Sequence, residues 1–299
     1  MTDKLRNRKA RGRDLKKSGS RVSVVGASRS RRTYPVVTLL TDFGTADYFV
    51  AAVKGVILTA NPKEQIVDIT HEIPPHDIEA AAFTLLSVCS SFPPATIHLA
   101  VVDPGVGSSR RPIIVQTGEQ LFVGPDNGIF SYVYDRPGDS PRRILHVTNE
   151  KYFRRPVSPT FNGRDVFAPV AAALSLGVPL AELGVEVTDF VRLPPLAPET
   201  AADGSINARI IHIDRFGNCV TNISQNELKP EMIAAGVKLK IKGRSVNSFR
   251  NYFTEQSDSP EKVFAIWGSA GFLEIAAAND SAARLLRAKR GDIVITSQR

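Results

Sequence analysis

Three aspartates stand at or near the ends of short apolar runs in the first third of the chain. Asp42, Asp68 and Asp103 each belong to such a run or directly follow one. In an open parallel sheet the ligand lies beyond the carboxyl ends of the strands, so carboxylates placed there can reach a ribose or a cation. Glycines follow Asp42 and Asp103 closely, and a residue without a Cβ lets the backbone approach a ligand. These residues predict a ligand site at one sheet edge, although Asp42 can alternatively cap the helix after it.

The elements around these aspartates alternate between strand and helix. Short β-branched and apolar runs predict strands, and the amphipathic runs between them predict helices. This alternation is typical of parallel strands joined by right-handed crossovers. The predicted order is a strand at 35–41, a helix at 48–58, a strand at 65–70, a helix at 78–88 capped by Asp77, a strand at 96–102, a hairpin at 113–116 and 120–123, a strand at 142–147, and a helix that opens within 160–165 and stops at Gly177.

The composition changes near residue 194. Residues 194–204 are rich in Pro and Ala, as in a linker, and the segment beyond them has short strands with polar turns, which predicts a small barrel or sandwich. The predicted fold class is α/β, with an N-terminal α/β domain on a mainly parallel sheet at 34–193 and a smaller C-terminal all-β barrel domain at 205–299. The strands expected in the second domain lie at 208–213, 237–241, 263–267, 272–275 and 292–296.

The net charge of +8 is concentrated at the N-terminus. Residues 1–33 hold 12 of the 38 Lys and Arg and two of the 30 acidic residues, which leaves 26 basic and 28 acidic residues in 34–299. We therefore expect a basic disordered tail at 1–33 and a nearly neutral body that does not bind nucleic acid. Two distant cysteines, Cys89 and Cys219, and the lack of an apolar run of about 18 residues favour a cytoplasmic protein without a membrane span.

Six motifs occur in an order that resembles one enzyme family. They are Thr41-Asp42-Phe43-Gly44, Asp68-Ile69-Thr70-His71, Asp103-Pro104-Gly105-Val106-Gly107, Phe161-Asn162-Gly163-Arg164-Asp165, Ile213-Asp214-Arg215-Phe216-Gly217-Asn218 and Gly268-Ser269-Ala270-Gly271-Phe272-Leu273-Glu274. Together they resemble the S-adenosylmethionine (SAM) hydroxide adenosyltransferases, which are related to the adenosyl-fluoride and adenosyl-chloride synthases. The resemblance implies hydrolysis of SAM to adenosine and methionine without a metal or cofactor. It also implies a homotrimer whose ligand lies between one subunit's first domain and its neighbour's second.

The resemblance implies which residues do the chemistry. The family's catalytic set looks like an Asp, an Arg and a His, which correspond to Asp103, Arg110 and the second position of a Phe-His-Gly-Arg-Asp motif, where this chain has Asn162. An amide can donate and accept a hydrogen bond but does not titrate near neutral pH, so Asn162 is expected to place a water without taking its proton. The residues expected to bind the substrate are Asp42, Asp47, His76, Phe161, Asp214, Phe216, Asn218, Ser269, Glu274 and Ala277.

The expected reaction is an in-line attack of water on C5′ of the sulfonium. The leaving group departs as a neutral thioether and needs no general acid, so the site has only to hold and activate one water. Asp103 is expected to orient that water or accept its proton while Arg110 fixes the carboxylate. The plainer alternatives are that Asp103 and Arg110 brace a glycine turn, that Asn162 is an ordinary turn residue, and that Phe161 and Phe216 are core residues.

Three other functions compete with SAM hydrolysis. A metal-dependent hydrolase would draw on carboxylates and imidazoles, but no His-x-His, His-x-x-x-His or Asp-x-His spacing occurs. A protein that binds SAM or adenosine without activity would fit Asn162. The halogenating branch is disfavoured because Asp103 is present and the segment from Arg110 to Val123 is too short for that branch's inserted loop. The candidate metal ligands would be Asp42, Asp68, His71, His98, Asp103 and Asp126, although His71 and His76 fit packing or capping better.

Overall fold

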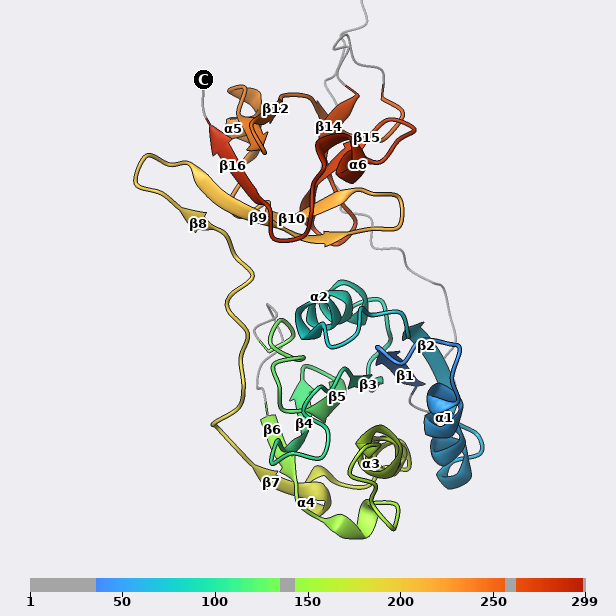
Figure 1. Cartoon of the computed structure of the whole chain (residues 1–299). Coiled ribbons are helices and arrows are strands. Elements are labelled where there is room, and N and C mark those ends of the chain that lie inside the picture. The colour runs from blue at the N-terminus through green and yellow to red at the C-terminus, as the bar shows by residue number, and fades with distance from the viewer. Residues whose placement is uncertain (1–35, 135–142, 256–261, 298–299) are drawn as a thin grey trace, which may run out of the picture. The chain divides into compact units, whose positions relative to one another are not determined.

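The computed structural model describes residues 36–134, 143–255 and 262–297 (Figure 1), so the predicted tail at 1–33 lies outside the described residues. The first half of the described chain forms a seven-stranded sheet in the order β2-β1-β3-β5-β4-β6-β7. Its strands are β1 (Val36–Thr41), β2 (Gln65–Thr70), β3 (Ile97–Val101), β4 (Pro112–Thr117), β5 (Gln120–Pro125), β6 (Arg143–Val147) and β7 (Gly184–Glu186).

Parallel strands dominate this first sheet. β1 pairs in parallel with β2 and with β3, and β3 pairs in parallel with β5. β4 lies antiparallel between β5 and β6, and β7 is antiparallel to β6. The strands β1, β2, β3, β5 and β6 therefore point in one direction, which confirms the mainly parallel sheet. The carboxyl ends of β1 and β3 meet at one edge, where Asp42 and Asp103 follow them.

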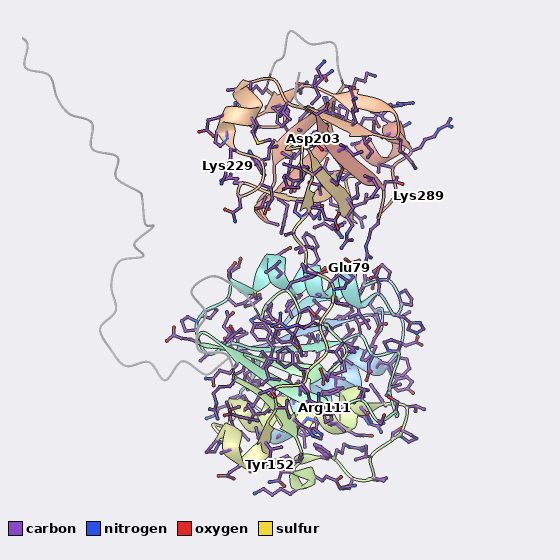
Figure 2. All side chains as sticks on the ribbon, turned by 90° about the vertical axis from the view of Figure 1, so that its left-hand side faces the viewer. Glu79, Arg111, Tyr152, Asp203, Lys229 and Lys289 are labelled. Atoms are coloured by element: carbon purple, nitrogen blue, oxygen red, sulfur yellow. The ribbon has the colours of Figure 1, made fainter. Side chains whose placement is uncertain are left out.

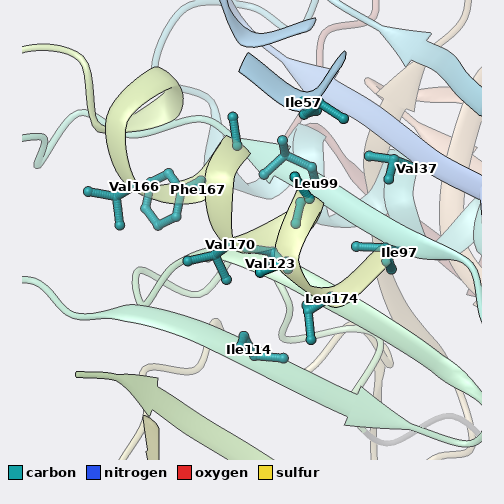
Figure 3. Close-up of a cluster of buried hydrophobic side chains, with 14 of the residues drawn as sticks. Val37, Ile57, Ile97, Leu99, Ile114, Val123, Val166, Phe167, Val170 and Leu174 are labelled. Atoms are coloured by element: carbon teal, nitrogen blue, oxygen red, sulfur yellow. The ribbon is translucent and has the colours of Figure 1, made fainter. Parts of the chain in front are cut away.

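Helices cover both faces of the first sheet (Figure 1). Val37 and Leu39 of β1 pack with residues of α1 and α3, as Figure 3 shows around Val37, whereas Leu40 packs with residues of α2. Successive side chains of a strand point to opposite faces, so β1 is buried on both sides, and this explains its nearly continuous apolar sequence. The helices are α1 (Phe49–Ala60), α2 (Ile78–Cys89), α3 (Ala168–Ser175) and the short α4 (Leu180–Leu183).

The ends of these helices follow the predicted signals, with one difference. Asp77 caps α2 by accepting a hydrogen bond from the Ala80 N–H at 3.0 Å, as expected. Gly177, with φ of +84°, ends the segment after α3. The segment before α3 is not the predicted start of an α-helix but a π-helical turn at Gly163–Phe167, in which the N–H of Ala168 donates to the Gly163 carbonyl. This wider turn carries the residues that follow Asn162.

The second half forms a curled sheet of nine strands in the order β12-β11-β16-β9-β10-β15-β14-β13, with β8 paired to β9. In the described part of the chain no ladder joins β12 to β13, so the curled sheet resembles the predicted barrel without closing through hydrogen bonds. The elements are β8 (Glu199–Thr200), β9 (Ile206–Ile213), β10 (Cys219–Ser224), α5 (Pro230–Ala234), β11 (Lys238–Ile241), β12 (Arg244–Val246), β13 (Phe249–Arg250), β14 (Val263–Trp267), β15 (Phe272–Ala277), α6 (Ala282–Leu286) and β16 (Ile293–Ser297).

Sequence patterns did not predict β10, the short strands β8, β12 and β13, or the two short helices of this half. β10 lies between β9 and β15 and is buried along most of its length. Its buried polar residues satisfy their hydrogen bonds with backbone carbonyls: Thr221 donates to Leu273 at 2.8 Å and Asn222 donates to Leu196 at 2.8 Å. A strand of this kind lacks the polar and apolar alternation on which strand prediction depends. The predicted domain boundaries stay predictions, and β8 falls inside the predicted linker.

Among the residues that the structure describes, no helix combines the length and the apolar character that crossing a lipid bilayer requires.

Candidate active site

An aspartate and an arginine form a close ion pair just beyond β3. The Asp103 side chain is only 5% exposed. The Nε of Arg110 donates to both carboxylate oxygens, at 2.9 and 3.0 Å, and Nη2 donates to Oδ2 at 2.5 Å. The intervening turn is closed by the Val106 N–H, which donates to the Asp103 carbonyl, and by the Ser108 N–H, which donates to the Gly105 carbonyl. This two-pronged geometry fixes the orientation of the carboxylate.

Asn162 completes the cluster from a different part of the chain. Its Oδ1 accepts a hydrogen bond from Nη2 of Arg110 at 2.6 Å, and its Nδ2 donates to the Ser158 carbonyl at 3.0 Å. The predicted trio of Asp103, Arg110 and Asn162 is therefore brought together. The guanidinium of Arg110 also lies over the ring of Phe167, 5.1 Å from its centroid, and this cation–π contact helps to hold the arginine side chain in place.

The loop before Asn162 contacts the loop after Asp103 backbone to backbone. Gly107 has φ of +79°, and a Cβ at this position would lie 2.3 Å from the carbonyl oxygen of Pro159. Only glycine fits this close approach without moving one of the loops. The glycine-rich sequence after Asp103 therefore has a structural purpose beyond the predicted approach to a ligand, because it lets these two loops meet.

Replacing Gly107 by Ala should separate the two loops. The expected cost in the free energy of unfolding is about 2 kcal/mol, because the new Cβ meets a backbone carbonyl and the backbone has positive φ. Gly105→Ala is the matched control, since a Cβ there would have its nearest neighbour, Ser108 Oγ, at 3.4 Å. Urea unfolding followed by circular dichroism measures both variants. Equal stability of the two would contradict the close approach.

A cavity of ≈ 300 Å³ opens at this edge of the first sheet. Its walls include five of the predicted residues: Asp42, His76, Asp103, Phe161 and Asn162. Oδ2 of Asp42 accepts a hydrogen bond from the backbone N–H of His76 at 2.9 Å, and His76 has φ of +67°. The turn that holds His76 therefore fixes the Asp42 carboxylate at the cavity wall. Asp47 is exposed and does not line this cavity.

Three aromatic rings form one wall of the same cavity. Phe43, Phe49 and Phe161 all line it. Their ring centroids lie 5.8 Å apart for Phe43 and Phe49, 6.0 Å apart for Phe43 and Phe161, and 5.2 Å apart for Phe49 and Phe161. Phe161 is buried and packs edge-on in this aromatic cluster, as its core alternative predicts, and it also lines the cavity, while its contact with a nucleoside stays a prediction.

A second cavity, of ≈ 730 Å³, lies in the curled sheet. Its walls include all six of the substrate-binding residues predicted for this half. Sequence reasoning missed Trp267 and Phe253, which supply aromatic surface to it, and the position of the single Trp beside Gly268 was an available signal. The predicted residues in its walls are Asp214, Phe216, Asn218, Ser269, Glu274 and Ala277.

Two of the three acidic residues in the walls of this second cavity, Asp214 and Glu274, have different environments. The Asp214 carboxylate stabilises the turn that follows it, since its Oδ1 accepts hydrogen bonds from the backbone N–H groups of Phe216 and Asn218 at 2.9 and 2.8 Å. Glu274 lies against Gly268, where a Cβ would come 1.9 Å from its Oε1. Burial, and then repulsion from Asp214, raise the pKa of Glu274 above its ordinary value. A cationic group entering the cavity would favour the ionised form of Glu274.

Asp68 does not line the cavity with Asp42 and Asp103, although the sequence predicts all three at one sheet edge. It sits inside β2, as the predicted strand at 65–70 implies, and its side chain binds Lys54 Nζ at 2.6 Å and lies 3.2 Å from Nε2 of His71. Burial alone would raise the pKa of Asp68, but the hydrogen bonds from Lys54 and His71 lower it below its ordinary value. His71 is buried and its Nδ1 pairs with Thr41 Oγ1 at 2.9 Å, as expected for packing. These residues brace the turn after β1 instead of lining the cavity.

The ligand set of the competing metallohydrolase is not assembled. Arg111, which is labelled in Figure 2, binds Asp126 with Nη2 and Oδ2 2.6 Å apart, and His98 pairs with Thr38 at 2.8 Å in the core. Across residues 36–134, 143–255 and 262–297, no three Asp, Glu, His or Cys side chains gather as candidate metal ligands. The absence of a cofactor stays a prediction.

Two family models together match most of this chain. Residues 37–184 match the family model of the SAM hydroxide adenosyltransferase N-terminal domain, and residues 208–295 match that of the C-terminal domain. A protein of Salinispora tropica named (R)-S-adenosyl-L-methionine hydrolase is 43% identical over 66% of this chain and 75% of its own length. One of the same name from Methanocaldococcus jannaschii is 38% identical over 84% of this chain and 91% of its own.

More distant relatives and a solved structure extend the comparison. A fluorinase of Actinoplanes sp. is 28% identical over 69% of this chain and 78% of its own length. The crystal structure of an uncharacterized conserved protein from Thermotoga maritima superposes with a TM-score of 0.81 at 33% identity, covering 88% of this chain and 100% of the other. The higher identity to the hydrolases agrees with the predicted separation from the halogenating branch.

Proposed function

Because the chain belongs to the SAM hydroxide adenosyltransferase family, we propose that it hydrolyses SAM to adenosine and L-methionine. The observation that carries the proposal is the cluster of Asp103, Arg110 and Asn162, two members of which line a cavity that also holds Asp42. The curated relatives are named for the (R) epimer at sulfur, and we extend that preference to this chain. We place the reaction in the cytoplasm, with SAM as substrate and no resident cofactor.

The proposed chemistry needs one activated water. The water oxygen forms a bond to C5′ while the C5′–S bond breaks, and its electron pair stays on sulfur, so methionine leaves as a neutral thioether. One proton leaves the attacking oxygen. Asp103 is positioned to orient the water and to accept or pass on that proton, because Arg110 holds its carboxylate from one side and leaves the cavity side open.

Asn162 has a narrower role in this proposal than the sequence implied. Its oxygen already accepts from Arg110 and its nitrogen already donates to Ser158. We therefore assign Asn162 mainly to holding Arg110, with water placement as a secondary role. Asp42 is assigned to the ribose, as the family resemblance implies, and Phe161 supplies apolar surface beside it.

We further propose that the complete ligand site combines the two cavities from neighbouring subunits of a homotrimer. The residues of the first cavity belong to the first sheet's half of the chain, and those of the second belong to the curled sheet, with none shared. The residues Asp214, Phe216, Asn218, Ser269, Glu274 and Ala277 would then contact the adenine and amino-acid ends of SAM. Asp47 lines neither of these two cavities, so its contact with SAM would have to arise when the ligand or a neighbouring subunit is in place.

The test is adenosine formation by the purified protein. We expect the full-length protein to convert the (R) epimer of SAM, and the (S) epimer more slowly, with adenosine and methionine released in equal amounts and measured by chromatography. Activity should persist in EDTA, because the proposed water activation uses a carboxylate and a guanidinium alone. Loss of activity in EDTA with recovery on addition of zinc would favour the metallohydrolase. Tight binding without product would favour a binding protein.

A further inference from the structure

We propose that Asp165 is a positioning residue that fixes the amide of Asn162 and, through it, the pair of Arg110 and Asp103. This inference rests on the proposed SAM hydrolysis. It concerns a residue that neither cavity includes and to which sequence reasoning gave no role.

Asp165 is the fully buried anchor of the loop before the π-helical turn. Its side chain has no exposed surface. Oδ1 accepts hydrogen bonds from Arg154 at 3.1 Å and from Arg164 at 2.7 Å. Oδ2 accepts from Arg164 at 2.8 Å and from the backbone N–H of Ser158 at 2.9 Å. A buried carboxylate that accepts four hydrogen bonds can adopt only one orientation, so it holds the backbone N–H of Ser158 in place.

Ser158 transmits this position to Asn162. Its backbone N–H donates to Asp165, and its carbonyl accepts from Nδ2 of Asn162. If the Asn162 amide were reversed, its oxygen would face the Ser158 carbonyl and its nitrogen would face Nη2 of Arg110, and both contacts would be repulsive. The fixed carbonyl therefore selects the orientation in which the Asn162 oxygen accepts from Arg110.

The π-helical turn brings Asp165 and Asn162, the first and last residues of this series of contacts, close together. The N–H groups of Arg164 and Asp165 both donate to the Phe161 carbonyl, at 3.2 and 3.1 Å, so the turn opens directly after Asn162. π-helical turns of this kind occur often at functional sites, where they redirect one side chain relative to the helix. Here the turn points the Asp165 carboxylate back at the loop that carries Ser158.

A double-mutant cycle tests whether Asp165 acts through Asn162. Asp165→Asn keeps the size of the side chain but removes its charge, and we expect kcat for adenosine formation to fall about tenfold with little change in KM, as for the loss of one orienting hydrogen bond. In the Asn162→Ala background the same substitution should change kcat by less than about twofold, since the residue it positions is gone. Arg154→Gln is the matched control, because it weakens the same ion-pair cluster at an exposed position.

The outcomes separate this inference from the proposed function. An equal fall in kcat in both backgrounds would assign Asp165 to stability alone and overturn the inference. A parent protein that forms no adenosine in the same assay would overturn the proposed function instead. If Asp165→Asn does not fold by circular dichroism, Asp165→Glu replaces it in the cycle, because that variant keeps the charge while moving the carboxylate by one methylene.

Discussion

Replacing Asp103 by Asn should slow adenosine formation by a factor on the order of 10²–10⁴, the range that acid and base groups contribute. The amide cannot accept the proton of the attacking water, and its NH₂ group would face Arg110, where the carboxylate now accepts three hydrogen bonds. SAM binding should persist, because Asp42 and the residues of the second cavity are untouched. Single-turnover adenosine formation measures the chemical step directly.

Variants at Asn162 provide the comparison. Asn162→Ala should cost less than Asp103→Asn, because Arg110 keeps its contacts with the Asp103 carboxylate. Asn162→His should retain activity, since a neutral imidazole also offers one acceptor for Arg110 and one donor for the Ser158 carbonyl. An Asp103→Asn enzyme that reacts as fast as the parent would remove the catalytic assignment.

Mixing two inactive variants should restore activity if the site is shared between subunits. Asp103→Asn disables the first cavity, and Ser269→Arg places a long cationic side chain at an exposed position of the second cavity. After the two proteins are unfolded together and reassembled at equal amounts, a site with both halves intact forms with a probability of roughly one quarter. We therefore expect roughly one quarter of parental activity from a mixture of two nearly inactive proteins.

The control for this experiment is each variant refolded alone, which should stay inactive. Sedimentation of the parent should show a trimer, since closed rings are how head-to-tail contacts avoid open fibres. A mixture that stays inactive although the two variants assemble together, or a dilute monomer with full activity, would show that one chain builds the whole site.

The central strands of the first sheet and their order along the chain could be predicted because burial on both faces leaves a direct trace in sequence. β1 and β3 are nearly continuous apolar runs, and Asp42 and Asp103 follow them because a buried strand must end before a charged residue can reach solvent or a ligand. Asp68 was wrongly expected at the ligand site, although its strand was predicted correctly. β2 is partly exposed along its length and tolerates a charge inside the strand, where Asp68 binds Lys54 and does not line the cavity.

The Asn162 amide orientation could not be predicted from sequence. It depends on the backbone carbonyl of Ser158, and a backbone group leaves no trace in the residue types. The π-helical turn also escaped prediction, because Gly163–Phe167 has the composition of an ordinary helix start. Asn162 and Asp165 belong to the same family motif, so the sequence alone does not distinguish their positions. Their contacts show that Asn162 lines the cavity and that Asp165 holds the loop behind it.

The π-helical turn makes this site more vulnerable to changes in chain length than to changes in residue type. Deleting one residue between Gly163 and Phe167 would allow a regular α-helical turn, so the local backbone geometry would become more favourable. α3 is buried almost throughout and cannot rotate, so the segment before it would turn by about 100°, the angle between successive residues of an α-helix. Asn162 would then lose its hydrogen bond with Arg110, although the protein would still fold. Natural variation at this turn should therefore consist of substitutions, with insertions and deletions confined to loops that the site does not use.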